Sequence, residues 1–216
     1  MIFIKTHKDF NIKEIPINKE NYNEFSIISR ETLSNDYPVN VIYDNDNFLN
    51  KWSNLYGDMT YHYYVYKHID EYDDIIGFIQ YRRYFDRYVL NNYKKILNDH
   101  DVILPGSINF DDIIYQYDMN HPPGFLKNII DLIHEYKPSY EINLKCIIPH
   151  NMFIMKKKDY IEYCKFMFWC FEILNIKYNM YKTYNDDINY LRIFSFIGER
   201  ISTFFYLNHF DHNRIY

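Results

Sequence analysis

The sequence of 216 residues contains no alanine, only five glycines and seven prolines, and no long apolar run. Its low glycine and proline content excludes a collagen-like chain and many disordered chains. Because a membrane-spanning helix needs about 18 apolar residues, the sequence predicts no membrane span. The first residues also lack the basic and long apolar regions of a signal peptide. We therefore expect a cytoplasmic protein, or one of the host cytoplasm if the gene is viral.

Cysteine is scarce as well, and acidic residues outnumber basic ones, 29 to 24. Cys146, Cys164 and Cys170 are too few and too irregularly spaced for a disulfide framework or a zinc knuckle, which favours a reducing compartment. The formal net charge is −5, whereas nucleic-acid binding draws most of its affinity from clustered lysine and arginine. The composition thus argues against a nucleic-acid partner and still allows a small anionic ligand.

Aromatic residues are abundant, with 25 tyrosines and 17 phenylalanines, and 48% of the chain is hydrophobic. Ile, Asn, Lys, Tyr and Phe have AT-rich codons, so the composition indicates an AT-rich genome, as in some large DNA viruses, low-GC bacteria and protists. Codon usage explains the aromatic excess more simply than stacking on bases or sugars does. The length and hydrophobic content predict one domain, residues 1–216.

Hydrophobic periodicity predicts an α/β fold in which a central, mostly parallel mixed sheet is flanked by helices. Residues 11–50 are polar and predict a loop with short helical turns. Continuous apolar runs predict strands, and apolar residues at three- and four-residue spacing predict helices. The strands are expected at residues 2–5, 75–79, 101–105, 146–149 and 152–155, and the helices at 52–68, 89–98, 125–136, 158–174 and 189–207.

Polar segments follow two of the predicted strands. Thr6-His7-Lys8 follows the first strand and Gln80-Tyr81-Arg82-Arg83 follows a central one, so both segments should lie on one rim of the sheet. Guanidinium groups are suited to phosphate or carboxylate. Strand alternation would direct the two arginines to opposite faces, so that one holds an anion and the other pairs with an acid. The alternative is that both are ordinary surface residues.

Acidic and histidine residues give weaker signals for a metal. Asp44-Asn45-Asp46 has the spacing with which two carboxylates share a divalent cation, but a solvated loop explains it as well. His209 and His212 could supply imidazole ligands, although a polar tail is the simpler interpretation. We find no P-loop, no dinucleotide fingerprint and no hydrolase nucleophile elbow.

Glu199 and Arg200 stand next to each other in the last apolar segment. A carboxylate in such a stretch must be paired or take part in chemistry. A structural ion pair and a catalytic base both remain open at this point.

Four segments, among them Gln80-Tyr-Arg-Arg-Tyr-Phe85 and Phe196-Ile-Gly-Glu-Arg200, together resemble the DUF4422 family of glycosyltransferase-like proteins, which looks related to GT-A transferases. The segments are residues 4–8, 72–85, 149–157 with Tyr163-Cys164, and 196–200. The most specific element of the family, His-Tyr-Arg-Arg-Tyr-Phe, here reads Gln80-Tyr-Arg-Arg-Tyr-Phe85. A second departure is Asp58-Met-Thr60, where the family tends to have Glu-Leu-Thr. The chain also resembles in size and composition the amino-terminal, GT-A-like domain of a chlorella-virus glycosyltransferase that binds a UDP-sugar and manganese.

The resemblance implies a glycosyltransferase that moves a sugar from a nucleotide-sugar, most readily a UDP-sugar, to a glycan hydroxyl group. Glu199 would act as general base or orient the sugar, and Arg83 would stabilise the charge on the diphosphate. The residues expected to contact the donor are Thr6, His7, Lys8, Gln80, Tyr81, Arg82 and Asn151.

The GT-A likeness also implies Mn²⁺ or Mg²⁺ and allows other glycosyltransferases as partners. The candidate ligands are Asp44, Asp46, His209 and His212, with Asp73 and Asp74 expected at the wrong end of their strand. Two other functions stay open: a nucleotide-sugar hydrolase, and a non-catalytic sugar-binding or virion-associated protein that keeps only the fold.

Overall fold

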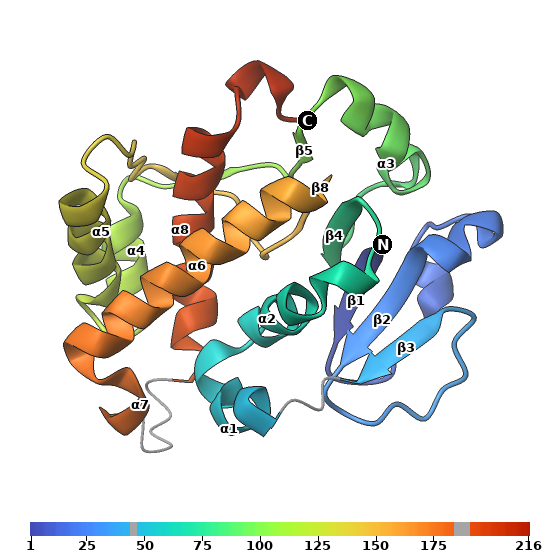
Figure 1. Cartoon of the computed structure of the whole chain (residues 1–216), viewed down its shortest axis with the longest axis horizontal. Coiled ribbons are helices and arrows are strands. Elements are labelled where there is room, and N and C mark those ends of the chain that lie inside the picture. The colour runs from blue at the N-terminus through green and yellow to red at the C-terminus, as the bar shows by residue number, and fades with distance from the viewer. Residues whose placement is uncertain (44–46, 184–190) are drawn as a thin grey trace.

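The computed structural model describes residues 1–43, 47–183 and 191–216, and its centre is a six-stranded sheet with the order β3-β2-β1-β4-β8-β5 (Figure 1). The first four strands in this order are parallel, and β8 is antiparallel to both of its neighbours. The predicted α/β fold with a mostly parallel mixed sheet is confirmed. The strands of this sheet are β1 Ile2–Thr6, β2 Phe25–Ser29, β3 Asn40–Tyr43, β4 Ile75–Gln80, β5 Val102–Ile103 and β8 Phe153–Lys156.

The remaining elements are mostly helices. A separate antiparallel pair joins β6 Ile108–Asn109 to β7 Cys146–Ile147. The α-helices are α1 Asn47–Tyr56, α2 Met59–Lys67, α3 Arg87–Asp99, α4 Ile113–Asp118, α5 Phe125–Tyr136, α6 Lys157–Tyr178, α7 Met180–Thr183 and α8 Ile193–His209. Short 3₁₀ helices lie at Ile12–Glu14, Lys19–Glu24, Ile69–Glu71 and His212–Arg214. Within the described ranges, no helix has the length and apolar character to cross a membrane.

Alternating side chains of the central strands pack into two hydrophobic cores, one on each face of the sheet. Phe3 and Phe78 pack on the side of α1, α2, α6 and α8, which lie together in Figure 1. Ile4 and Ile79, from the opposite face, pack with α3 and with apolar residues of the segment 12–39. Because both faces are covered, the strands read in sequence as continuous apolar runs.

The expectation of a loop with short helical turns over residues 11–50 is right for the two 3₁₀ helices there and wrong for the rest, since this region also contains β2, β3 and the first part of α1. β2 is buried along its whole length even though Ser26 and Ser29 belong to it. The Ser29 hydroxyl group donates to the carbonyl of Glu31 at 2.9 Å, which satisfies it inside the fold. Such a strand has too few consecutive apolar residues to stand out by its sequence.

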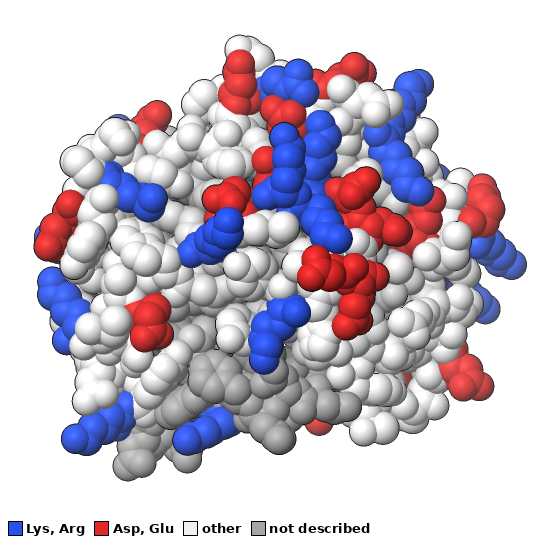
Figure 2. Space-filling model, in the orientation of Figure 1, with Lys and Arg blue, Asp and Glu red and all other residues white. Residues whose placement is uncertain are grey.

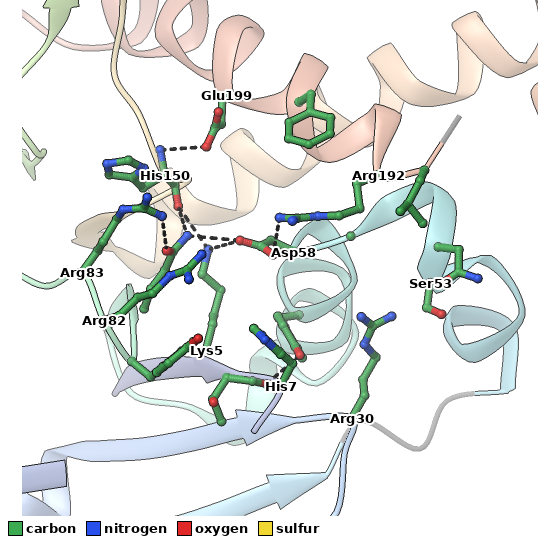
Figure 3. A pocket seen from close by; sticks show the side chains of 18 residues that line it. Lys5, His7, Arg30, Ser53, Asp58, Arg82, Arg83, His150, Arg192 and Glu199 are labelled. Carbon is green, nitrogen blue, oxygen red and sulfur yellow. Dashed lines mark hydrogen bonds and ion pairs between the residues drawn. The ribbon is translucent and has the colours of Figure 1, made fainter. Parts of the chain in front are cut away.

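The single helix expected over residues 52–68 is also wrong. The structure has α1 and α2 there, separated at Gly57 and Asp58. Gly57 has φ +54°, and a Cβ atom at this position would lie 2.9 Å from Cβ of Ser195. A left-handed residue ends a helix readily when it is glycine. The break directs Asp58 toward the carboxyl ends of the central strands (Figure 3).

Candidate functional site

A cavity of about 520 Å³ lies at the carboxyl ends of β1, β2 and β4, against the start of α2 and the start of α8 (Figure 3). This is the position at which ligands usually bind in open α/β sheets. Its lining residues are Lys5, Thr6, His7, Arg30, Ser53, Asn54, Gly57, Asp58, Tyr61, Gln80, Tyr81, Arg82, Arg83, His150, Leu191, Arg192, Phe196 and Glu199.

The strand side of the cavity is held by the register of the sheet. Lys5 pairs with Gln80, and the amide of Tyr81 donates to the carbonyl of Lys5 at 3.1 Å. Gln80 and Arg83 then exchange backbone hydrogen bonds of 2.8 and 3.2 Å, which closes a tight turn. The strand therefore ends at Gln80, and both Arg82 and Arg83 line the same cavity. The expectation that these arginines point to opposite faces is wrong, because strand alternation stops before them.

Asp58 joins the helix side to the strand side. Its Oδ2 atom accepts a hydrogen bond from Nε2 of Gln80 at 3.2 Å and lies 3.8 Å from Nζ of Lys5. Its Oδ1 atom lies 3.4 Å from a guanidinium nitrogen of Arg192, the residue that precedes α8. One carboxylate thus links β1, β4 and the start of α8.

Glu199 lies on α8, and its side chain faces the cavity while that of its neighbour turns away. Oε1 of Glu199 accepts a hydrogen bond from the amide of His150 at 3.0 Å. Arg200 donates at 2.7 Å to the carbonyl of Phe196 and at 2.7 Å to Oε1 of Gln116. Its contact with Oε2 of Glu199 is longer, at 3.6 Å. Burial raises the pKa of Glu199, while Arg200 and the His150 amide lower it. A carboxylate with a raised pKa is suited to proton transfer.

Positive charge dominates the cavity: five lysine or arginine side chains and two carboxylates line it. Figure 3 shows Arg30 and Arg192 approaching the space from opposite sides. Within the described part of the chain, Arg30 and Arg82 have no ion-pair partner and stack instead near the rings of Tyr61 and Tyr81, at 5.6 and 5.7 Å. On the face seen in Figure 2, by contrast, acidic and basic side chains are intermixed. The cavity is therefore a concentrated cationic site in an acidic protein.

The surroundings of the two cavity histidines, His7 and His150, disfavour the protonated form of both side chains. Burial lowers the pKa of His7, and the charges of Lys8 and Arg82 lower it further. Burial also lowers the pKa of His150, together with the charges of Arg83 and Lys5. Burial also lowers the pKa of Lys5, while Asp58 and Glu199 raise it. The arginines, which stay charged, therefore carry most of the positive charge of the site.

The residues expected to contact a donor fall into two groups. Thr6, His7, Gln80, Tyr81, Arg82 and Arg83 line the cavity with Glu199, as the sheet rim predicts. Lys8 is exposed and is not among the lining residues; its Nζ atom lies 5.6 Å from the centre of the Tyr81 ring. Asn151 is 1% exposed and lies outside the lining set. Donor contact by Lys8 or Asn151 would need a change in these positions.

The metal candidates that the structure describes do not lie at the cavity. His209 contacts Asp159 at 3.1 Å near the other end of α8, and His212 lies in the 3₁₀ helix that follows. Asp73 and Asp74 precede β4, at the end of the sheet away from the cavity, as expected. Asp44 and Asp46 lie outside the described residues. No group of three or more His, Cys, Asp or Glu side chains suited to a metal ion occurs in the described ranges.

Several residues of the cavity have no counterpart in the sequence-based prediction: Lys5, Arg30, Asp58, His150 and Arg192. A lone lysine inside an apolar strand and a Gly-Asp pair inside a helical pattern are signals that could have indicated Lys5 and Asp58. The others follow an unrecognised strand or lie in loops, so that only the three-dimensional fold brings them to the site.

Comparison with known proteins agrees with this fold and with the family resemblance. The model of DUF4422, a domain of unknown function, matches residues 1–211, and the chain therefore belongs to this family. A sequence comparison with curated proteins gives no match.

A comparison of solved structures gives the apo structure of WbbM, a bifunctional glycosyltransferase, with a TM-score of 0.74 and 18% sequence identity. The match covers 100% of this chain and 44% of the WbbM chain, so this chain spans less than half the length of that protein. At this identity the likeness establishes a shared fold.

Proposed function

We propose that this protein is a glycosyltransferase that moves a sugar from a nucleotide-sugar donor, first of all a UDP-sugar, to a hydroxyl group of a glycan. The observation that carries the proposal is the cavity itself. It combines five cationic side chains with an inward-facing carboxylate, Glu199, at the carboxyl edge of a sheet. The fold shared with a glycosyltransferase supports the same function.

In this proposal the arginines bind the diphosphate of the donor. Arg82 and Arg30 have no ion-pair partner in the described ranges, and Arg192 extends from the facing helix. When the bond between the sugar and the diphosphate breaks, negative charge grows on the leaving group. Fixed cations already in place stabilise that charge without reorganisation.

Glu199 supplies the proton chemistry. In an inverting transfer its carboxylate takes the proton of the acceptor hydroxyl group, and in a retaining transfer it orients the donor sugar. The raised pKa of Glu199 makes its carboxylate a stronger base than that of an ordinary glutamate.

A divalent cation, Mn²⁺ or Mg²⁺, remains a proposal that rests on the family resemblance. The described lining residues do not fit its donor set, since hard cations prefer several free oxygen ligands. The carboxylate oxygens of Asp58 already contact Gln80, Lys5 and Arg192. Gln80 stands where the family has histidine, and an amide binds metals poorly. We derive no step through the metal.

The test is an assay of nucleoside diphosphate release from a panel of nucleotide-sugars, with and without a mixture of glycan acceptors. The proposal predicts release that depends on an acceptor and is lost in Glu199→Gln. Equal release without any acceptor would identify a nucleotide-sugar hydrolase instead. Binding without release under every condition would favour a non-catalytic sugar-binding protein.

A further inference from the structure

We propose that Lys5 is a positioning residue for Glu199: its buried ammonium group holds the turn formed by His150 and Asn151, and this turn fixes the carboxylate of Glu199. The inference rests on the proposed function only where Glu199 is named as the base. The contacts themselves connect β1, the β7–β8 loop and α8.

The first step is the burial of Lys5, which is 3% exposed in a strand of five buried residues. A buried ammonium group costs free energy unless hydrogen bonds and opposite charge compensate. Nζ of Lys5 donates to the carbonyl of Asn151 at 2.9 Å and lies 3.5 Å from that of His150. Nε2 of His62 lies at 3.4 Å, and Oδ2 of Asp58 lies at 3.8 Å. The ammonium group of Lys5 is therefore surrounded by acceptor atoms of the protein.

The second step is the conformation of the turn. His150 has φ 75° and Asn151 has φ 48°, so two consecutive residues with side chains are left-handed. Such residues cost free energy and persist only where the surroundings impose them. Both of their carbonyl oxygens lie within 3.5 Å of the ammonium group of Lys5. The contacts of these two carbonyl oxygens with one ammonium group compensate the free-energy cost of the left-handed backbone.

The third step links the turn to Glu199. The carbonyl of His150 faces Lys5, while its amide donates to Oε1 of Glu199 at 3.0 Å. The carbonyl of His150 also accepts from Nε2 of Gln80 at 3.1 Å, which anchors the turn to β4 as well. If the turn relaxes, the amide leaves Glu199, and the carboxylate loses the donor that orients it.

The charges around Glu199 set the expected direction of a pH effect. Arg200 on α8 and Lys5 on β1 lower the pKa of Glu199, and Asp58 at the start of α2 raises it. Arg83 and Arg192 also line the cavity, and they are unchanged by a substitution at position 5. Removal of Lys5 takes away both a positive charge and the support of the His150 amide. The pKa of Glu199 should therefore rise further.

The experiment compares the wild-type chain with Lys5→Met, which keeps the length of the side chain and removes its charge. NMR measures two quantities that need no activity: hydrogen exchange of the His150 amide, and titration of the Glu199 side-chain carboxyl carbon, assigned by its loss in Glu199→Gln. We expect exchange at least about tenfold faster and a titration midpoint about one unit higher. Lys95→Met, an exposed position on α3, is the matched control and should change neither.

Two results would overturn the proposal. One is an unchanged His150 exchange rate in folded Lys5→Met, and the other is an unmoved Glu199 midpoint. If Lys5→Met does not fold, Lys5→Gln is measured in its place, because its amide can still donate to the carbonyls. The loss of charge alone should then raise the midpoint, and an unmoved midpoint would again contradict the role of Lys5.

Activity gives a separate readout. Lys5→Met should lower kcat and shift the acid limb of its pH profile upward while KM for the donor changes less than about twofold, since Nζ is already bonded to the carbonyl of Asn151. A raised KM with unchanged kcat would make Lys5 a donor-binding residue and overturn the proposal. If no donor is turned over by any variant, yet both NMR changes occur, the positioning role stands and the proposed function fails.

Discussion

Gln80 donates a hydrogen bond from Nε2 to Oδ2 of Asp58 at 3.2 Å, across 22 positions of sequence. Nε2 of Gln80 also donates to the carbonyl of His150 at 3.1 Å, so the same amide contacts the loop that precedes β8. The longer amide of Gln80 meets the shorter carboxylate of Asp58. One side-chain amide thus joins the end of β4 to the start of α2.

Replacement of Asp58 by Asn should destabilise the fold. Lys5 would keep its buried ammonium group but lose the carboxylate that opposes it, and a charged partner of this kind contributes about 1–3 kcal/mol. We expect a lower free energy of unfolding in urea at pH 7. Asp70→Asn, at an exposed position, should leave it unchanged. Equal stability of both variants would show that Asp58 does not compensate Lys5.

Loss of either Arg82 or Arg192 should weaken the binding of nucleoside diphosphates. A charge-assisted hydrogen bond contributes about 2 kcal/mol, which corresponds to roughly thirtyfold in Kd. Titration calorimetry with UDP on Arg82→Ala and Arg192→Ala measures this change. Arg87→Ala, an exposed residue at the start of α3, is the control. Equal affinity of all three variants for UDP would show that Arg82 and Arg192 do not bind the diphosphate.

Glu199→Gln should separate activity from stability. Transfer should fall by at least about 100-fold, since general-base catalysis contributes that much or more. Burial raises the pKa of Glu199, so the folded state binds its proton more tightly than the unfolded chain does. The stability from this group is present at low pH and lost as the pH rises through the raised pKa. At pH 7 the neutral variant should melt at the same temperature or higher, and a clearly lower melting temperature would indicate a structural ion pair instead.

A chelator tests the role of the arginines against that of a metal. If arginine side chains alone carry the charge of the diphosphate, saturating EDTA should leave donor turnover unchanged. Turnover that EDTA abolishes and Mn²⁺ restores would establish the cation that the resemblance implies. Asp44 and Asp46 would then be the first ligands to replace by Asn.

Asp9 should stabilise the loops next to the cavity in a pH-dependent way. Its carboxylate accepts hydrogen bonds from the hydroxyl and amide of Ser34 and the amide of Asn35, which lower its pKa from 3.8 to about 2. The stabilisation is present above the unfolded value and lost as the pH falls toward 2. Asp9→Ala should therefore be less stable than wild type at pH 7, and the difference should shrink toward pH 3. A difference independent of pH would exclude the carboxylate as its cause.

The sequence predicts the strands whose apolar runs are continuous, and it misses those whose burial depends on distant partners. The strand Ile75–Gln80 could be predicted because five apolar or small residues stand together in its sequence. Phe25–Ser29 was not, since its serines are satisfied only inside the fold. The missed strand also concealed Arg30, which follows it directly.

The candidate site was predictable where its residues follow a recognised strand. His7, Gln80 and Arg82 lie at the cavity because the register of β1 and β4 brings their ends together. Lys5 and Asp58 were not predicted as site residues, because the sequence marks each as an unusual charge but does not show that the two lie 3.8 Å apart. The carbonyl of Asn151, which the sequence gives no sign of burying, accepts a hydrogen bond from the same lysine.

The most direct test of the nucleotide-sugar site is a thermal-shift screen against UDP-, GDP-, dTDP- and CMP-sugars, each with and without Mn²⁺, on the wild-type chain and on Arg82→Ala/Arg192→Ala. A ligand at about 100 times its Kd stabilises the folded state by about 2.7 kcal/mol, which raises Tm by roughly 5 °C or more in a chain of this size. We predict such a shift with one class of nucleotide-sugar in the wild type and its loss in the double variant. No shift with any of them, or an equal shift in both chains, would contradict a diphosphate site at these arginines.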